Sequence, residues 1–427
     1  MMSAFDKVIG YESIKSELLQ ICDMIHNRLI YEKLGARLPK GVLLYGNPGL
    51  GKTLIARCFV EETGVQTYTI RRNVGGESFI QLIHDTFRTA RENAPAIVFL
   101  DDLDKFANED EEHRNAEEYV AVQAGIDSVR ETEVFIIATV NDEWKLPDSL
   151  TRAGRFDRKI EMYRPTSKDA ALIIQHYLGT KKVSPDVNME DLAMMMTYGS
   201  CAELETILND AAIHAAYLRE DFITMKHLVH AVLRMQYESP DNDAKIGADD
   251  LRKIALHEAG HLVVCEVICP GSVGLASIRS SGHDSTGGFI HRCKELRRRP
   301  YHILVSLAGK AAVELYHSET CASGCCNDIE RASRHIRKAI SESGTSGFGM
   351  IDISGGRFPD ASENLTARNE AVVHSELERY MFMTRNILLK NRDFLEKTAE
   401  ALLQKETLLY SDIRAIRNSV DITEVAV

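Results

Sequence analysis

The hydrophobic pattern of the first 165 residues predicts buried strands that alternate with helices. A continuous apolar run at 41–45 is followed by a glycine-rich turn and then by a helix-forming run at 54–62. Two further apolar runs, at 96–100 and 134–140, are separated by long helical patterns. Short apolar runs between helices are typical of a parallel sheet with crossover helices, so this part is expected to be an α/β domain.

Beyond Pro165 the pattern is helical and predicts a small all-helical lid. The expected helices of this lid lie at 170–178, 191–196, 201–218 and 224–235. The polar stretch 238–243 contains Pro240, and a polar segment with a proline is typical of a linker. A second domain is therefore expected to begin just beyond it.

The second domain is expected to be mainly helical. It opens with a helix near Asp249, contains a glycine-broken, β-rich section around 272–291, and ends in helices at 363–391 and 413–418. The predicted division of the chain is 1–165 for the α/β domain, 166–237 for the lid, 238–248 for the linker and 249–427 for the second domain.

Composition and charge narrow the class of function. Of the 427 residues, 44% are hydrophobic and 27% are charged, as in ordinary globular chains. The net charge of −12 works against nonspecific nucleic-acid binding, so no nucleic-acid partner is expected. The short basic run at 297–299 predicts a solvated helix end.

The cysteines and the apolar stretches predict a cytoplasmic chain. Nine cysteines lie without disulfide-like spacing, and no signal peptide precedes them, which favours a reducing compartment. The longest apolar stretches are far shorter than the roughly 20 residues that span a bilayer. Residues 1–6 run almost directly into structured-looking sequence, so no N-terminal anchor is expected, and membrane association would need a partner.

The segment 46–53 matches the P-loop pattern of nucleotide-binding proteins, after a predicted strand and before a predicted helix. It consists of Gly46, Asn47, Pro48, Gly49, Leu50, Gly51, Lys52 and Thr53. The glycines let backbone N–H groups surround the phosphates, Lys52 neutralises the β and γ oxygens, and Thr53 offers a hydroxyl to magnesium. The sequence therefore predicts a site for ATP with magnesium.

Polar residues after the later strands extend this site. Asp101 and Asp102 end an apolar strand, where a P-loop enzyme places one carboxylate near magnesium and another against the attacking water. Asn141 can orient that water or be an ordinary turn asparagine. Arg152 and Arg155 can face one γ-phosphate, or they can form a surface ion-pair cluster.

A second chemical motif lies in the helical pattern 251–267. His257 and His261 are four residues apart and share one helix face, so both can bind one zinc ion. Glu258 can take a proton from a zinc-activated water, which would attack a peptide carbonyl. The motif needs a third ligand from elsewhere in the chain.

The motif order of the first half resembles that of AAA+ ATPases, and the two motifs together resemble the FtsH family of AAA+ zinc proteases. The resemblance runs from about Phe5 to at least Phe348. It implies a P-loop AAA+ parallel-sheet domain with a helical lid, followed by a mainly α-helical zinc metallopeptidase domain. The implied activity is ATP-dependent metalloendopeptidase action on protein substrates. The alternative is a nonproteolytic remodelling ATPase or chaperone with a vestigial peptidase domain.

The resemblance also implies roles for single residues. Asp328, in a segment like the one that supplies the family's aspartate ligand, becomes the third zinc ligand, although a helix-capping carboxylate is the plain alternative. Arg152 and Arg155 would reach into a neighbouring subunit's site, which implies a homo-oligomer, by resemblance a ring of six. The implied walls of the adenine pocket are Val8, Ile9 and Gly10 on one side and Gly199 and Ala202 on the other.

Three features depart from the family pattern. Asp102 stands where a glutamate is usual, so ATP hydrolysis is expected to be slower or its water differently placed. The segment 71–76 has Asn73 where an aromatic residue is usual before Val-Gly, which puts the grip on a translocated substrate in doubt. Membrane-spanning segments that normally precede the motor are absent from the sequence.

Other candidates have two readings. Cys321, Cys325 and Cys326 lie near the proposed aspartate ligand, but their spacing fits no tetrahedral cysteine site and favours packing. Glu314 can support a zinc histidine or belong to a solvated helix face. The segment 287–290 can be an edge strand that pairs with extended substrate, or a plain hairpin.

Overall fold

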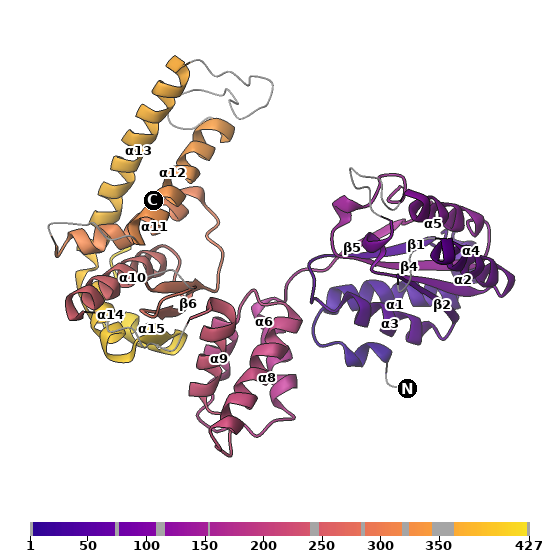
Figure 1. Cartoon of the computed structure of the whole chain (residues 1–427), viewed down its shortest axis with the longest axis horizontal. Coiled ribbons are helices and arrows are strands. Elements are labelled where there is room, and N and C mark those ends of the chain that lie inside the picture. The colour runs from indigo at the N-terminus through magenta and orange to yellow at the C-terminus, as the bar shows by residue number, and fades with distance from the viewer. Residues whose placement is uncertain are drawn as a thin grey trace. The chain divides into compact units, whose positions relative to one another are not determined.

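The computed structural model describes residues 3–72, 77–107, 116–152, 154–239, 247–282, 287–317, 324–343 and 363–424. The chain divides into two compact units (Figure 1). The first unit consists of Met1–Thr180 with Tyr198–Thr206, and the second consists of Lys181–Thr197 with Ile207–Val427.

The first unit is built on a five-stranded parallel sheet with the strand order β2-β3-β4-β1-β5. The strands are β1 (Gly41–Tyr45), β2 (Gln66–Arg71), β3 (Ala96–Asp101), β4 (Val134–Val140) and β5 (Arg158–Glu161). The three strands expected from apolar runs are the three central ones. β2 and β5 lie at the edges and are half exposed, so their sequences carry no continuous apolar run.

Helices cover both faces of this sheet. The covering helices are α1 (Glu12–His26), α3 (Lys52–Thr63), α4 (Glu77–Glu92) and α5 (Ala116–Ser128), and the unit also contains α2 (Arg28–Lys33) and α6 (Ser167–Leu178). Along β1, Val42 and Leu44 pack with residues of α1 and α3, whereas Leu43 packs with residues of α4 and α5. Because successive side chains of a strand point to opposite faces, these three residues join both layers of the core. Truncating the fully buried Leu43 to alanine would cost about 2–5 kcal/mol.

The second unit is mainly helical, so the predicted fold class is confirmed. Its helices are α7 (Met189–Met195), most of α8 (Cys201–Tyr217), α9 (Met225–Tyr237), α10 (Ala248–Ile268), α11 (Arg299–Glu314), α12 (Gly324–Ser343), α13 (Glu363–Lys390), α14 (Arg392–Lys405) and α15 (Tyr410–Asn418). A three-stranded antiparallel sheet, in the order β7-β6-β8, joins β6 (Val273–Ser277), β7 (Phe289–Arg292) and β8 (Thr407–Leu409).

Helices α10 and α11 form the centre of this unit. Gly260 permits their close approach, because a Cβ atom on it would lie 2.5 Å from the carbonyl oxygen of Ala308. Ala259, Leu262 and Val263 of α10 are fully buried in the same core. This packing holds the middle of α10 in a fixed place.

Helices α7 and α9 of the predicted lid, and most of α8, belong to the second unit. Asp191 of α7 accepts hydrogen bonds of 2.7 Å each from the backbone N–H and the hydroxyl of Ser411 in α15. Gly274 of β6 lies against the backbone of Met194, and a Cβ atom there would be 2.3 Å from that carbonyl oxygen.

Across the described residues, no helix combines the length and apolar character needed to traverse a bilayer.

Candidate functional site

The P-loop connects β1 to α3 and turns sharply. Gly46 has φ 141°, and a Cβ atom there would lie 2.3 Å from the carbonyl oxygen of Met162, so no other residue fits. The ammonium group of Lys52 donates hydrogen bonds to the carbonyl oxygens of Gly46 and Asn47, at 2.6 and 2.8 Å. Burial lowers the pKa of Lys52, and nearby carboxylates oppose that shift.

The structure brings Thr53 and Asp101 together, as a magnesium site beside a P-loop requires. The hydroxyl of Thr53 donates to Asp101 Oδ1 over 2.8 Å, and the hydroxyl of Thr139 in β4 donates to the same oxygen over 2.9 Å. The side chain of Asp101 is 2% exposed. The sequence analysis did not predict a role for Thr139. The local sign of that role was its single hydroxyl group in an otherwise apolar strand.

Asp102 sits in an unusual backbone conformation with φ 57°, in the left-handed region, where a non-glycine residue costs about 1–3 kcal/mol. Its backbone N–H donates to Thr139 Oγ1 over 2.9 Å. Its carboxylate pairs with Lys105 at 2.6 Å and lies 3.8 Å from the guanidinium of Arg71. The residue that departs from the family pattern is thus held on both its backbone and its side chain.

The remaining candidate residues of the nucleotide site differ in their contacts. Asn141 follows β4 directly and is half-buried, at the same edge of the sheet as Asp101. Arg155 makes a two-pronged ion pair with Asp127, at 3.0 and 2.8 Å. Arg152 is exposed and forms no ion pair among the described residues. Among the described residues, Arg155 is thus engaged in an ion pair and Arg152 is not.

The predicted walls of the adenine pocket meet beside the P-loop. Ala202 donates its backbone N–H to the carbonyl oxygen of Gly49 over 3.1 Å, and a Cβ atom on Gly49 would lie 2.9 Å from the hydroxyl of Ser200. The hydroxyl of Tyr11 lies 3.5 Å from the sulfur of Cys201. Tyr11 directly follows the predicted wall residues, Val8 (buried), Ile9 (half-buried) and Gly10 (φ 75°). Gly199, also half-buried, precedes the contact on the other wall.

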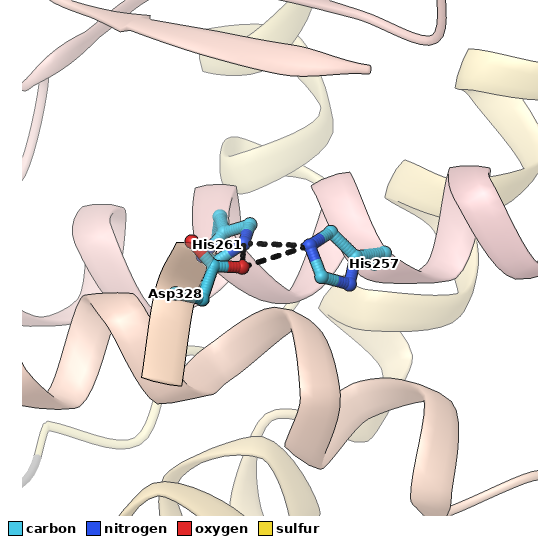
Figure 2. A group of neighbouring side chains, drawn as sticks. All are labelled: His257, His261 and Asp328. Atoms are coloured by element: carbon cyan, nitrogen blue, oxygen red, sulfur yellow. Dashed lines mark hydrogen bonds and ion pairs between the residues drawn. The ribbon is translucent and has the colours of Figure 1, made fainter. Parts of the chain in front are cut away.

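In the second unit, His257, His261 and Asp328 meet at one point (Figure 2). Both histidines project from the same face of α10, and Asp328 comes from the beginning of α12. The two Nε2 atoms are 3.0 Å apart, and each lies 3.1 Å from Asp328 Oδ2. These are the only described His, Cys, Asp or Glu side chains that gather in a group able to hold a metal ion.

The arrangement of these donors fits zinc. Zinc bonds of 2.0–2.1 Å in a tetrahedral site separate the donor atoms by about 3.3–3.4 Å, which is within a few tenths of an ångström of the distances here. Two imidazole nitrogens and one carboxylate are also the donors that zinc commonly takes. With three protein ligands, the fourth position is left for water or substrate.

Neighbouring groups orient the histidines. His261 Nδ1 donates to the carbonyl oxygen of Val305 over 2.6 Å, which leaves its Nε2 lone pair directed at Asp328 and His257. Gly309 of α11 lies against the other histidine, because a Cβ atom there would be 2.4 Å from the His257 ring. The sequence contained no signal for either contact, since both depend on how α11 crosses α10.

Glu258 is buried beside the triad, with 4% of its surface exposed. Burial raises the pKa of Glu258 to about 7, and the charge of Asp328 adds to this shift. A cation held by the triad would lower that pKa again. Gly288 lies directly against Glu258, since a Cβ atom on it would be 2.5 Å from Glu258 Cγ.

Two family models match the chain. The model described as ATPase family associated with various cellular activities (AAA) matches residues 42–164, and the model of peptidase family M41 matches residues 245–416. The first match contains the P-loop and the acidic pair, and the second contains all three triad residues.

Curated relatives match along almost the whole chain. An ATP-dependent zinc metalloprotease FtsH of Streptobacillus moniliformis is 32% identical over 99% of this chain and 65% of its own length. One from Leptotrichia buccalis is 30% identical over 96% of this chain and 56% of its own length. The FtsH 3 protein of Symbiobacterium thermophilum is 31% identical over 95% of this chain and 69% of its own length. The chain belongs to the FtsH family. It spans less than two thirds of the first two of these relatives.

The other candidates in this FtsH-family chain lie outside the triad. Cys325 is buried and Cys326 exposed, and neither belongs to the metal group. Cys321 and the segment 73–76, which includes Asn73, fall outside the described residues. Glu314 pairs with Lys310 at 2.7 Å and with Arg385.

The segment at 287–290 leads into an edge strand of the FtsH-family chain. β7 pairs antiparallel with β6 along one side, in a hairpin register that sets Phe289 opposite Ser277. No described strand pairs with its other side. Both earlier readings of this segment are therefore compatible with the fold.

Proposed function

We propose that the chain is an ATP-dependent zinc metalloendopeptidase that unfolds and degrades proteins. The observation that carries the proposal is the meeting of His257, His261 and Asp328 beside the buried carboxyl group of Glu258. The same chain contains a P-loop whose Thr53 contacts Asp101. In this proposal residues 1–165 and 166–237 form the motor and its lid, and residues 249–427 form the peptidase.

At the nucleotide site, the proposed roles follow from the P-loop and from the acidic pair Asp101 and Asp102. Backbone N–H groups of the P-loop and Lys52 would hold the phosphates, while Thr53 and Asp101 would hold magnesium. Asp102 would receive the attacking water's proton, with Asn141 orienting that water. The short side chain of Asp102 and its pairing with Lys105 support slow hydrolysis rather than loss of ATP binding.

At the peptidase site, His257, His261 and Asp328 would hold zinc. Zinc, when bound, supplies Lewis-acid activation of a water molecule and of a peptide carbonyl. The Glu258 carboxylate would accept the proton of the attacking water and pass it to the leaving amide nitrogen. The unpaired side of β7 can add an extended substrate as a further strand, and the contact of Gly288 with Glu258 brings that strand close to the proposed general base.

The chain is proposed to act as a homo-oligomeric ring, of six subunits by family resemblance. Arg152 is exposed and therefore available to a neighbouring subunit, whereas Arg155 is engaged by Asp127. An arginine supplied in trans contributes about 10³–10⁵ to the rate in related phosphoryl-transfer systems. We therefore assign the larger share of this role to Arg152.

Protein substrates and a cytoplasmic location complete the proposal. Folded domains are stable by about 5–15 kcal/mol, so a peptidase that accepts extended chain gains from a motor that pulls its substrates open. The cysteines of the described residues are all unpaired, which supports a reducing compartment.

The decisive experiment is the degradation of a loosely folded test protein by the zinc-loaded chain, with and without ATP. Cleavage that needs zinc, is accelerated by ATP and is lost in Glu258→Gln is the expected result. Lys52→Ala should remove the acceleration by ATP. Measurable ATP hydrolysis without any cleavage would contradict the proposal and support a remodelling ATPase instead.

A further inference from the structure

The edge strand β7 is held from both of its faces. On one face, Gly288 lies so close to Glu258 that a Cβ atom would approach the carboxyl side chain to 2.5 Å. Because residues alternate between faces along a strand, Phe289 and His291 point to the opposite face. The position of the strand beside Glu258 therefore depends on what supports that opposite face.

The support comes from Tyr237, the last residue of α9. Its ring stacks on Phe289, with centroids 4.1 Å apart and planes inclined by 20°. Its hydroxyl lies 2.5 Å from His291 Nδ1, and its carbonyl oxygen accepts from the backbone N–H of Gly282 over 3.1 Å. We call Tyr237, Phe289 and His291 the aromatic brace.

The protonation states within the brace give its hydrogen bond a direction. Burial raises the pKa of Tyr237, so the phenol keeps its proton. Burial also lowers the pKa of His291 to about 4, so the imidazole is neutral and can accept. The neutral imidazole can therefore accept from the hydroxyl at Nδ1 and carry its own proton on Nε2.

The other nitrogen of His291 is buried and has no partner among the described residues. His291 is 8% exposed, and leaving a buried N–H unpaired destabilises a fold. A leucine or phenylalanine would fill this position without that cost but could not accept from Tyr237. The destabilising unpaired nitrogen and the hydrogen bond with Tyr237 together indicate that His291 serves to fix the position of β7.

We propose that Tyr237 is a positioning residue for peptide hydrolysis, which holds the edge strand β7 at the distance from Glu258 that lets an extended substrate pair with it. The inference rests on the proposed peptidase function. Tyr237 ends the last helix of the predicted lid, so a movement of α9 would be transmitted to the strand through the brace. Tyr237 itself does not touch the reacting atoms.

The test compares steady-state cleavage of a short unstructured fluorogenic peptide by zinc-loaded full-length variants. Tyr237→Phe keeps the ring but removes the hydroxyl, and we expect KM to rise about five-fold, the change that one hydrogen bond corresponds to, with kcat within about two-fold. His291→Leu should also raise KM about five-fold, whereas His291→Asn, which retains an acceptor, should keep KM at the wild-type value. Tyr316→Phe, which removes a remote hydroxyl bonded to Glu396, is the matched control.

A second measurement separates this inference from the proposed function. Amide hydrogen exchange of residues 289–292 should be about five-fold faster in Tyr237→Phe and unchanged in Tyr316→Phe, whether or not any peptide is cleaved. Unchanged exchange, or an unchanged KM, would overturn the positioning role. A parallel loss of kcat and zinc content would overturn it as well, because it would show that Tyr237 only maintains the fold. Cleavage that persists in Glu258→Gln would instead contradict the peptidase assignment.

Discussion

At the scale of single residues, His291 makes the stability of the second unit depend on pH. Its imidazole is buried in the neutral form, and burial lowers its pKa to about 4. In the unfolded chain an imidazole has a pKa of about 6.5. The unfolded state therefore binds more protons between these two values.

The free energy of unfolding should accordingly fall as the pH decreases through this window. The contribution of His291 is complete above pH 6.5 and is lost by about pH 4, a difference of about 3 kcal/mol. Denaturant unfolding of the zinc-free chain between pH 7 and pH 4 measures it. His291→Asn should flatten the pH dependence, and the exposed His374→Asn should not. Identical slopes for wild type and His291→Asn would show that the histidine is not buried as described.

A second residue-scale prediction concerns Gly309. Any side chain there meets the His257 ring at 2.4 Å, so Gly309→Ala must displace this ligand or move α11. Zinc affinity should fall about ten-fold to a hundred-fold, as when the groups around a metal ligand are changed. Competition with a chelator measures the affinity. The control is Gly247→Ala, whose new Cβ atom lies 3.5 Å from Asp250 and fits.

At the scale of elements, the approach of β7 to α10 determines the shape of the peptidase site. Neighbouring glycines precede the strand, and only one of them is in contact. A Cβ atom on Gly288 would lie 2.3 Å from the Ser277 carbonyl oxygen and 2.5 Å from Glu258 Cγ, whereas nothing lies within 4 Å of one on Gly287. The pair therefore provides a matched test of the spacing between the two elements.

Gly288→Ala should reduce peptide cleavage strongly while the zinc content stays unchanged. A displacement of about 1 Å at a catalytic centre costs on the order of 10²-fold in rate, and the clash requires a displacement of this size. Gly287→Ala should remain within about two-fold of wild type, since its side chain points into open space. Equal rates for the two variants would contradict the described position of β7.

At the scale of the whole molecule, each kind of chemistry lies within one unit. The P-loop, the acidic pair and residues 198–206 belong to the first unit, and the His-His-Asp triad belongs to the second. Loss of ATP hydrolysis need not remove peptide cleavage, and the reverse also holds. In the proposed ring, the assembly would have to couple the two activities. Arg152, exposed on the first unit, is the residue through which subunits are proposed to depend on each other.

Mixing inactive variants tests this dependence. Lys52→Ala and Arg152→Ala should each lose most ATP hydrolysis, the first because the P-loop lacks its cation and the second because its neighbours lack the arginine. In an equimolar mixture about one quarter of the interfaces combine an intact P-loop with an intact arginine, so about that fraction of activity should return. A mixture as inactive as its components would argue against an arginine acting between subunits.

Much of the fold and part of the candidate site could be predicted from local sequence. The strands β1 and β4 lie where continuous apolar runs predicted them, because central strands of a parallel sheet are buried on both faces. The P-loop and the two histidines of α10 were visible because their geometry is set within a few residues of one helix or turn. Asp328 was assigned only through family resemblance, since it lies 71 residues from His257.

The tertiary structure alone decided the contacts that join distant segments. Thr139 bridges Asp101 and the backbone of Asp102, Val305 orients His261, and the Tyr237 hydroxyl meets His291 across 54 residues. No local pattern predicts these pairs, because each depends on how helices cross and strands register rather than on periodicity within one element. The sequence by itself thus determined the kinds of chemistry the chain carries, and the packing of its elements decided which atoms lie close enough to perform it.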